Sequence, residues 1–348
     1  SKMLEVAGEY GLHGNLWANI LALALAYNEN VYSKATEIVG KTSGSINTFA
    51  IHDFRILREL IHFIPNINGD LLKEIYNYEG NGRDSKLVNT RVRDRILRLS
   101  KQLMEADSDN EFKDIITEFY KEYGVGKFGL NKAFRIGTDL KTANIIPITR
   151  VEHVYLNDII GYDLQKKKLI ENTESFIKGK PANNCLLYGD AGTGKSSSVK
   201  AIVNEYYDKG LRIIEIYKHQ FRYLSDILEQ LKDRNYKFII YMDDLSFEES
   251  ELEYKYLKAI LEGGFGRRPE NVLIYATSNR RHLIRESFRD KTETDEELHT
   301  RDTVEEKLSL SARFGEKIYY GSPDKKEFNS IVLALAKKHN IDMDESEI

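Results

Sequence analysis

Apolar residues recur at helical spacing through about the first 145 of the 348 residues. The clearest stripe lies within residues 85–106, and its members return every three or four positions: Val88, Val92, Ile96, Leu99 and Leu103. The pattern predicts helices over residues 15–28, 45–62, 70–78, 85–106 and 111–123. We therefore expect an all-helical N-terminal domain over residues 1–145.

The pattern changes between residues 142 and 157, where Pro147 interrupts a short β-prone stretch. Continuous apolar runs follow, which are typical of strands buried on both faces of a parallel sheet. These runs cover residues 185–188, 211–217, 238–242 and 271–277. They predict an α/β core over residues 146–322. A helical pattern over residues 328–338 predicts the start of a small C-terminal helical unit over residues 323–348.

A phosphate-binding motif separates the run at 185–188 from a stretch that reads as helix. The motif G-x-x-x-x-G-K-S consists of Gly189, Asp190, Ala191, Gly192, Thr193, Gly194, Lys195 and Ser196. Glycines let successive N–H groups and the positive end of the next helix, which Ser197 opens, surround an anion. Lys195 would reach the β- and γ-phosphates, and Ser196 would ligate Mg²⁺. A flexible glycine turn is the alternative, but the strand-to-helix context favours a nucleoside triphosphate.

Polar residues end the next two buried runs. Asp243 and Asp244 follow the run at 238–242, and Asn279 follows the run at 271–277. The carboxyl ends of parallel strands carry catalytic groups. Asp243 fits an acid that holds Mg²⁺ through water, and Asp244 fits one that polarises the attacking water. Asn279 fits a sensor of the γ-phosphate. The alternative for the two acids is that they cap a helix that begins near residue 245. The alternative for Asn279 is an ordinary turn residue.

The order of these elements, followed by LSLSARFG at 308–315, resembles the AAA+ ATPases. Three strings resemble the bacterial AAA-type family named domain of unknown function 815: DDLSFEE at 243–249, RPENVLIYATSNRRHL at 268–283 and EEKLSLS at 305–311. The resemblance covers about residues 150–335. It implies a P-loop (AAA+) parallel sheet with flanking helices. It also implies a C-terminal lid that lies largely beyond this chain, because only about thirty residues follow Gly315.

The resemblance also assigns roles to residues outside the phosphate loop. Ile160 and Gly161 fall in the segment that lies against the adenine in AAA+ proteins. Arg313 occupies the position of the arginine finger, which acts in the site of a neighbouring subunit and implies a homo-oligomer, a ring in the full-length protein. Ala312 stands where an acid is expected before that arginine. Alternative fingers are Arg267, Arg268, Arg280 and Arg281, and a plain surface arginine is the alternative for Arg313.

Composition and charge indicate which classes of partner the chain could bind. The net charge of −4 gives the whole chain no electrostatic case for nucleic acid. Arg91, Arg95 and Arg98 share one helix face that could contact phosphates, although such faces are usually solvated. The most apolar stretch, residues 16–27, is too short to span a bilayer. With a single cysteine and no leader pattern, we expect a cytoplasmic protein without a membrane segment.

Two further patterns bear on the task. No Asn-Lys-x-Asp element follows Asp243 to read guanine, so ATP is favoured over GTP. Residues 218–224 lack the glycine of a protein-threading loop; Lys218, Phe221 and Arg222 could touch a polymer or simply pack. Three hypotheses remain: an ATP-hydrolysing AAA+ protein that remodels a protein or nucleoprotein partner, a nucleotide-dependent switch with little turnover, and a helicase-loader-like DNA-associated ATPase.

Overall fold

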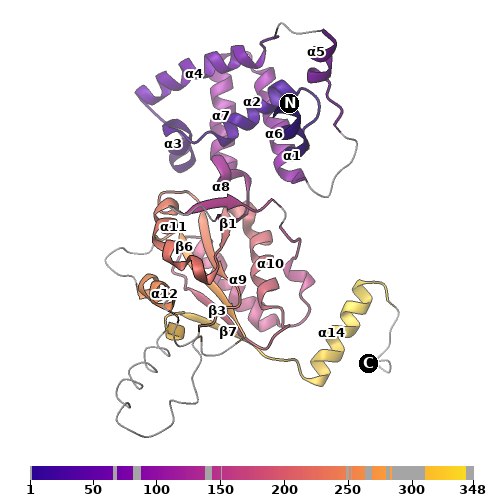
Figure 1. The fold of residues 1–348 in the computed structure, drawn as a ribbon, viewed down its shortest axis with the longest axis vertical. Coiled ribbons are helices and arrows are strands. Elements are labelled where there is room, and N and C mark those ends of the chain that lie inside the picture. Colours follow the sequence, from indigo (N-terminus) through magenta and orange to yellow (C-terminus); the bar gives the residue numbers. More distant parts are fainter. Residues whose placement is uncertain are drawn as a thin grey trace. The chain divides into compact units, whose positions relative to one another are not determined.

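The computed structural model describes residues 2–65, 69–80, 88–137, 143–149, 151–247, 251, 253–262, 269–279, 283 and 310–341. The chain forms two compact units (Figure 1). The helical unit comprises residues 1–131 and 147–151, and the sheet unit comprises residues 132–146 and 152–348.

Eight helices are described in the helical unit: α1 (Lys2–Tyr10), α2 (Leu16–Tyr27), α3 (Val31–Val39), α4 (Ser45–Ile61), α5 (Gly69–Tyr76), α6 (Thr90–Glu105), α7 (Asp109–Tyr123) and α8 (Gly126–Leu130). Helices α2, α4, α5, α6 and α7 confirm the five predicted ones. Four members of the predicted apolar stripe lie in α6 and are buried in the core: Val92, Ile96, Leu99 and Leu103. The fifth, Val88, precedes α6 and is half-buried. The helical N-terminal region is thus confirmed.

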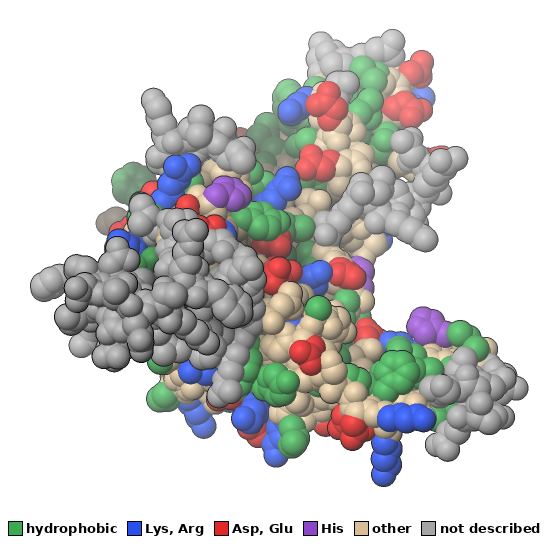
Figure 2. All heavy atoms as spheres, turned by 60° about the horizontal axis from the view of Figure 1, so that its bottom comes forward, with side chains coloured by type: hydrophobic (Ala, Val, Ile, Leu, Met, Phe, Trp, Pro, Cys, Tyr) green, Lys and Arg blue, Asp and Glu red, His purple; other side chains and the backbone are tan. Residues whose placement is uncertain are grey.

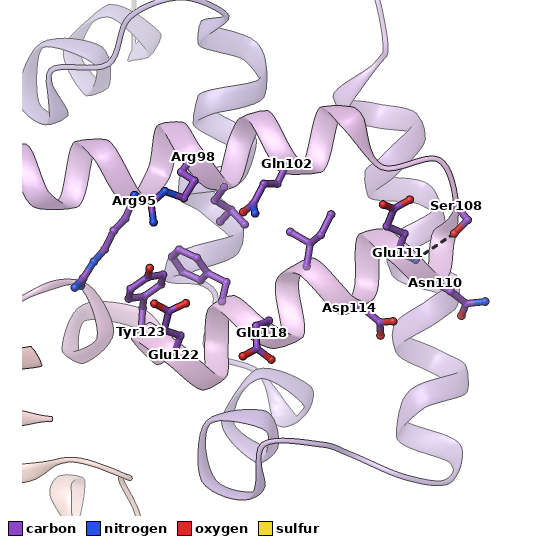
Figure 3. Close-up of a pocket in the computed structure, with 13 residues that line it drawn as sticks. Arg95, Arg98, Gln102, Ser108, Asn110, Glu111, Asp114, Glu118, Glu122 and Tyr123 are labelled. Carbon is purple, nitrogen blue, oxygen red and sulfur yellow. Dashed lines mark hydrogen bonds between the residues drawn. The ribbon is translucent and has the colours of Figure 1, made fainter. Parts of the chain in front are cut away.

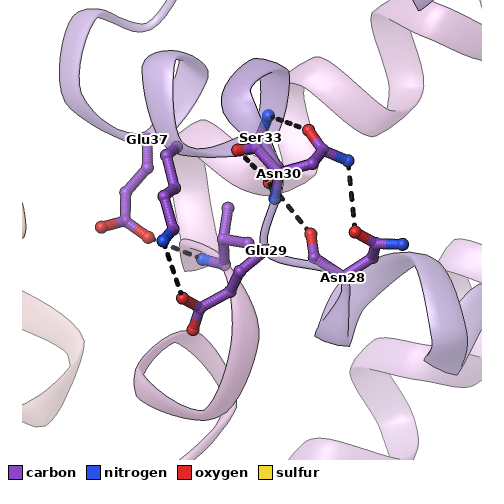
Figure 4. Close-up of polar contacts among 7 residues, drawn as sticks. Asn28, Glu29, Asn30, Ser33 and Glu37 are labelled. Atoms are coloured by element: carbon purple, nitrogen blue, oxygen red, sulfur yellow. Dashed lines mark hydrogen bonds and ion pairs between the residues drawn. The ribbon is translucent and has the colours of Figure 1, made fainter.

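Polar contacts fix the short helix α3, which the apolar pattern did not predict (Figure 4). The Asn30 side chain accepts a hydrogen bond from the Ser33 N–H, and the Ser33 hydroxyl accepts one from the Asn30 N–H, at 2.8 and 2.9 Å. The buried carboxylate of Glu37 accepts the Val125 N–H at 2.9 Å. A reciprocal cap of this kind defines a helix start without apolar periodicity.

Seven strands form the sheet: β1 (Ala133–Gly137), β2 (Asn144–Pro147), β3 (Cys185–Gly189), β4 (Leu211–Glu215), β5 (Lys237–Met242), β6 (Val272–Ser278) and β7 (Glu316–Tyr320). Their order is β2-β1-β4-β5-β6-β3-β7. The pairs from β1 to β7 in this order are parallel. Every residue of β6 is buried, which agrees with the continuous apolar runs seen in the sequence.

Helices flank the strands on both sides (Figure 1). They are α9 (Asp163–Ile177), α10 (Lys195–Tyr206), α11 (Leu224–Leu231) and α12 (Glu253–Glu262). A further helix, α14 (Lys325–Lys338), follows β7 and extends away from the strands in Figure 1. Short 3₁₀ turns η1 (Leu156–Asp158), η2 (Tyr207–Lys209) and η3 (Lys218–Tyr223) connect them. The predicted α/β fold is therefore confirmed. Within the described part of the chain, none of the helices combines the length and apolar character needed to cross a bilayer.

The sheet unit begins at Lys132, ahead of the boundary predicted at residue 145. Strand β1 pairs with β4, with Ala133 opposite Ile213 and Phe134 opposite Ile214. Five residues with one exposed position are too few to distinguish a strand from helix by periodicity. The apolar pattern therefore does not separate β1 from the preceding helices.

Candidate nucleotide site

The phosphate motif forms the tight connection between β3 and α10. Gly189, Gly192 and Gly194 have φ values of 132°, 75° and 84°, which side chains rarely adopt. A Cβ on Gly189 would also lie only 2.1 Å from the Tyr320 carbonyl oxygen of the neighbouring strand β7. The glycines therefore permit both the curvature of the loop and its close packing on the sheet.

Lys195 opens α10 and is buried beneath this loop. Its Nζ donates to the Gly189 carbonyl at 3.0 Å and to that of Asp190. Burial lowers the pKa of Lys195, and the nearby carboxylates of Asp190, Asp244 and Asp243 oppose that effect. Together with the positive end of α10, the ammonium group gives the loop the charge that a polyphosphate requires.

Three hydroxyl groups converge on one carboxylate oxygen at the end of β5. Asp243 Oδ1 accepts hydrogen bonds from Ser196 at 2.7 Å, Tyr241 at 2.7 Å and Thr277 at 2.6 Å. Burial works against the charge of Asp243, but these donors outweigh it and keep the pKa of Asp243 below its ordinary value. Asp243 is thus an anion at neutral pH, in contact with the serine predicted to ligate the same metal.

The donor set fits Mg²⁺. Among the described residues, no group of three His, Cys, Asp or Glu could hold a metal. Mg²⁺ in nucleotide sites takes only one or two protein oxygens and completes its shell with phosphate and water. Ser196 and Asp243 supply such a pair of oxygens.

Asp244 follows with a left-handed backbone, φ 47°. Its N–H donates to Thr277 Oγ1 at 3.0 Å, and its Oδ1 accepts from Asn279 Nδ2 at 2.9 Å. The structure thus brings together the two predicted polar groups at the ends of β5 and β6. Sequence reasoning missed Thr277 and Tyr241, although both lie within the buried runs that lead to these groups.

The segment predicted to lie against adenine approaches both the phosphate loop and α14. Ile160 and Gly161 are half-buried. A Cβ on Gly161 would lie 3.3 Å from Ile331 of α14, and one on Gly194 would lie 3.7 Å from Ile159. The Tyr162 hydroxyl donates to the Gly321 carbonyl at 3.0 Å, just before α14. The segment thus lies next to both the phosphate loop and α14.

The other loop residues connect the motif to its surroundings. Asp190 Oδ2 accepts the N–H and the hydroxyl of Ser322, both at 2.7 Å, and these bonds lower the pKa of Asp190. Thr193 Oγ1 donates to the Asp190 carbonyl at 2.8 Å. Ala191 is exposed and Ser197 is half-buried at the start of α10. The loop is therefore hydrogen-bonded to the segment that immediately precedes α14.

Comparison with known proteins identifies the family. Residues 130–348 match the family described as "Protein of unknown function (DUF815)". The chain belongs to this family. The resemblance to this family, drawn from the residue strings, is thereby confirmed.

Two curated relatives match short stretches of the DUF815 chain. A replication factor C large subunit of Staphylothermus marinus is 46% identical over 71 residues, which are 20% of this chain and 16% of that protein. A replication factor C large subunit of Sulfurisphaera tokodaii is 37% identical over 73 residues, or 21% and 16%. The chain thus spans only 16% of the length of these relatives.

Solved structures resemble the DUF815 chain at low identity. The Thermotoga maritima RuvB Holliday junction branch migration motor is 16% identical, with 56% of this chain and 57% of that chain covered and a TM-score of 0.36. DnaI is 18% identical, with coverage of 57% and 98% and a TM-score of 0.35.

Arg313, the predicted trans-acting finger, contacts its own chain. Its Nη2 lies 3.0 Å from Glu262 Oε1 at the end of α12, and about half of the Arg313 side chain (48%) is exposed. Ala312 beside it is exposed as well. The alternative fingers Arg267, Arg268, Arg280 and Arg281 lie outside the described residues.

The residues considered for polymer contact pack within the sheet unit. Phe221 is buried, with its ring centre 6.1 Å from that of Phe247. Lys218 Nζ donates to Glu251 at 2.6 Å. Arg222 is exposed, with its guanidinium 4.9 Å from the centre of the neighbouring Tyr223 ring. The structure therefore favours the packing interpretation for Phe221 and Lys218.

The arginine face of α6 borders a groove of about 640 Å³ between α6 and α7 (Figure 3). Arg95 lies 4.2 Å from the centre of the Tyr123 ring. Glu118 and Glu122 line the groove from α7, across from Arg95 and Arg98. Carboxylates that line the same groove as the arginines disfavour a bound phosphate backbone.

Proposed function

We propose that this protein binds ATP together with Mg²⁺, hydrolyses the ATP, and uses the cycle to remodel a protein or nucleoprotein partner. One observation supports the proposal above the others. The Ser196 hydroxyl, the two acids Asp243 and Asp244, and Asn279 belong to a single hydrogen-bonded cluster beside the phosphate loop. An accidental glycine loop would have no need of such a cluster.

Each group has a distinct task in the proposed reaction. Lys195 and the loop N–H groups bind the β- and γ-phosphates and neutralise charge that develops there. Ser196 and Asp243 hold Mg²⁺, which, when bound, shields the phosphate charges. Asp244 orients the attacking water and accepts its proton. Asn279 fixes Asp244 Oδ1, so the carboxylate presents its second oxygen in one direction.

The proposal includes a second subunit. Arg313 would leave Glu262 and neutralise phosphoryl charge in the site of a neighbouring copy, a contribution of roughly 10³ to 10⁵ in rate. An exchange of one carboxylate for a more highly charged phosphate is electrostatically favourable. The partner remodelled by such an oligomer is expected to be a protein or nucleoprotein, with the helical unit as the recognition part.

Phosphate release with ATP, GTP or no nucleotide tests the proposal. We expect Mg²⁺-dependent release with ATP, little with GTP, and loss of release in Asp244→Asn although ATP still binds. Asp233→Asn, an exposed acid in the loop before β5, is the matched control and should keep the wild-type rate. An Asp244→Asn variant that hydrolyses ATP as fast as the control would contradict the assignment.

A nucleotide-dependent switch is the second candidate. The ion pair between Arg313 and Glu262 favours it, because a finger held in its own chain supplies no charge to a neighbour. Tight ATP binding with slow hydrolysis at every protein concentration would single out this function.

A DNA-associated ATPase of the helicase-loader kind is the third candidate, favoured by the local similarity to replication factor C large subunits. Among the described side chains on the face in Figure 2, basic and acidic groups are interspersed, which weighs against it. Stimulation of hydrolysis by DNA, with a steep dependence on salt concentration, would establish this candidate.

A further inference from the structure

Thr277 is the second-last residue of β6. This strand lies between β3, which leads into the phosphate loop, and β5, which is followed by the two acids. In the register of the sheet Thr277 faces Leu187 of β3, and the preceding residue, Ala276, faces Met242 of β5. Its side chain is almost fully buried. This place brings the Thr277 hydroxyl to the junction between Asp243 and Asp244.

The Thr277 hydroxyl uses both of its hydrogen-bonding capacities there. It donates to Asp243 Oδ1 at 2.6 Å and accepts the Asp244 N–H at 3.0 Å. The Thr277 carbonyl accepts the Leu245 N–H at 2.7 Å. Three consecutive residues of the neighbouring segment are therefore bound by this one threonine.

These bonds hold an unfavourable backbone. Asp244 has φ 47°, a left-handed conformation that costs a non-glycine residue free energy unless its surroundings fix it. The turn sends the Asp243 carboxylate toward Ser196 and the Asp244 carboxylate toward Asn279. Two adjacent acids thereby face different partners.

We propose that Thr277 is a positioning residue that divides the work of the two acids, keeping Asp243 at the metal and Asp244 at the water. The inference rests on the proposed ATP hydrolysis and adds a residue to which the sequence motifs assign no role. Tyr241 contacts Asp243 alone, so it serves as a comparison within the same cluster.

The test compares Thr277→Val, which keeps the shape but removes the hydroxyl, with Thr277→Ser, which keeps the hydroxyl. For the valine variant we expect kcat at least about tenfold lower, with KM for ATP within about twofold. Its half-maximal Mg²⁺ concentration should rise several-fold. The serine variant should recover most of the wild-type rate, whereas a purely packing role predicts that valine is the better substitute.

Tyr241→Phe separates the two contacts of Thr277. It removes one donor from Asp243 and leaves the Asp244 backbone bound, so we expect a changed Mg²⁺ dependence with a smaller loss of kcat than in Thr277→Val. Circular dichroism and melting temperature establish that each variant is folded. If Thr277→Val fails to fold, the smaller Thr277→Ala replaces it with the same expectations.

A folded Thr277→Val protein with wild-type kcat and wild-type Mg²⁺ dependence would overturn the inference. If the wild type binds ATP but releases no phosphate, the proposed hydrolysis is wrong. The role of Thr277 is then tested by the Mg²⁺ dependence of ATP binding. A higher half-maximal Mg²⁺ concentration for ATP binding in the valine variant than in the serine variant then supports the positioning role. Equal half-maximal concentrations contradict it. A wild type without ATP binding contradicts both.

Discussion

A buried ammonium group dominates the phosphate loop at the scale of single residues. Lys195 is only 6% exposed, and a buried charge is costly unless polar groups satisfy it. The Gly189 and Asp190 carbonyls accept hydrogen bonds from its ammonium group, and three carboxylates lie close enough to favour its charge. The loop therefore holds Lys195 charged and in place, ready for a ligand with several negative oxygens.

Lys195→Ala should weaken ATP binding by at least about tenfold, because both charge and donors to the β- and γ-phosphates are lost. Titration with a fluorescent ATP analogue in the presence of Mg²⁺ measures the effect. Lys200→Ala is the control: this lysine lies on the same helix but pairs with Glu152 at 2.9 Å. Equal affinities of the two variants would refute the role of Lys195.

Local sequence was enough to locate the residues of the phosphate loop, because the glycine spacing and the flanking strand and helix are contiguous in the chain. It also predicted that Asp243, Asp244 and Asn279 follow the ends of two buried strands. Thr277 and Tyr241 were not predicted as site residues, because an apolar run shows only that a residue is buried in the sheet. Whether its hydroxyl meets a carboxylate depends on the register between strands that are distant in sequence.

At the scale of elements, one carboxylate connects two helices of the helical unit. Asp109 at the start of α7 accepts hydrogen bonds from Arg55 at 2.9 Å and Arg58 at 2.8 Å, both on α4. Bonds to the two guanidinium groups lower the pKa of Asp109. The folded protein thus binds a proton at Asp109 less readily than the unfolded chain. The contact stabilises the fold above about pH 4 and loses this effect as pH falls through the lowered pKa.

Asp109→Asn should lower the melting temperature at neutral pH by roughly 1–4 °C, since these groups remain accessible to solvent. Trp17, the only tryptophan, reports on the same unit because its Nε1 donates to the Leu60 carbonyl of α4 at 2.8 Å. The difference from wild type should persist between about pH 7 and 5 and disappear as the pH falls through the lowered pKa of Asp109. Asp114→Asn, an exposed acid of α7, is the control; an equal shift there would contradict the role of Asp109.

The longest helices were predicted from apolar periodicity, whereas several of the short elements were not. Helices α4, α6 and α7 have enough turns to display a stripe, whereas α8 has five residues and β1 has five. Helix α3 offered only a capping signal in Asn30 and Ser33. Periodicity needs several repeats, so elements of one or two turns are identified by tertiary contacts instead.

At the scale of the whole molecule, the site as described supplies every proposed catalytic group except a positive charge from a neighbouring copy. Arg313 is the candidate for that charge, and in the described chain it is paired with Glu262. Oligomer formation would therefore have to break this pair. The pair predicts that Glu262→Ala frees Arg313 and raises the hydrolysis rate at low protein concentration, measured by phosphate release.

The rate of ATP hydrolysis per subunit, measured against protein concentration, decides whether neighbouring subunits share a catalytic site. For the wild type the rate should climb with concentration. It should stay near background in Asp244→Asn and fall by about 10³ or more in Arg313→Ala. A slow rate that is independent of concentration and equal in wild type and Arg313→Ala would contradict a site shared between subunits, and would leave the nucleotide switch as the better account.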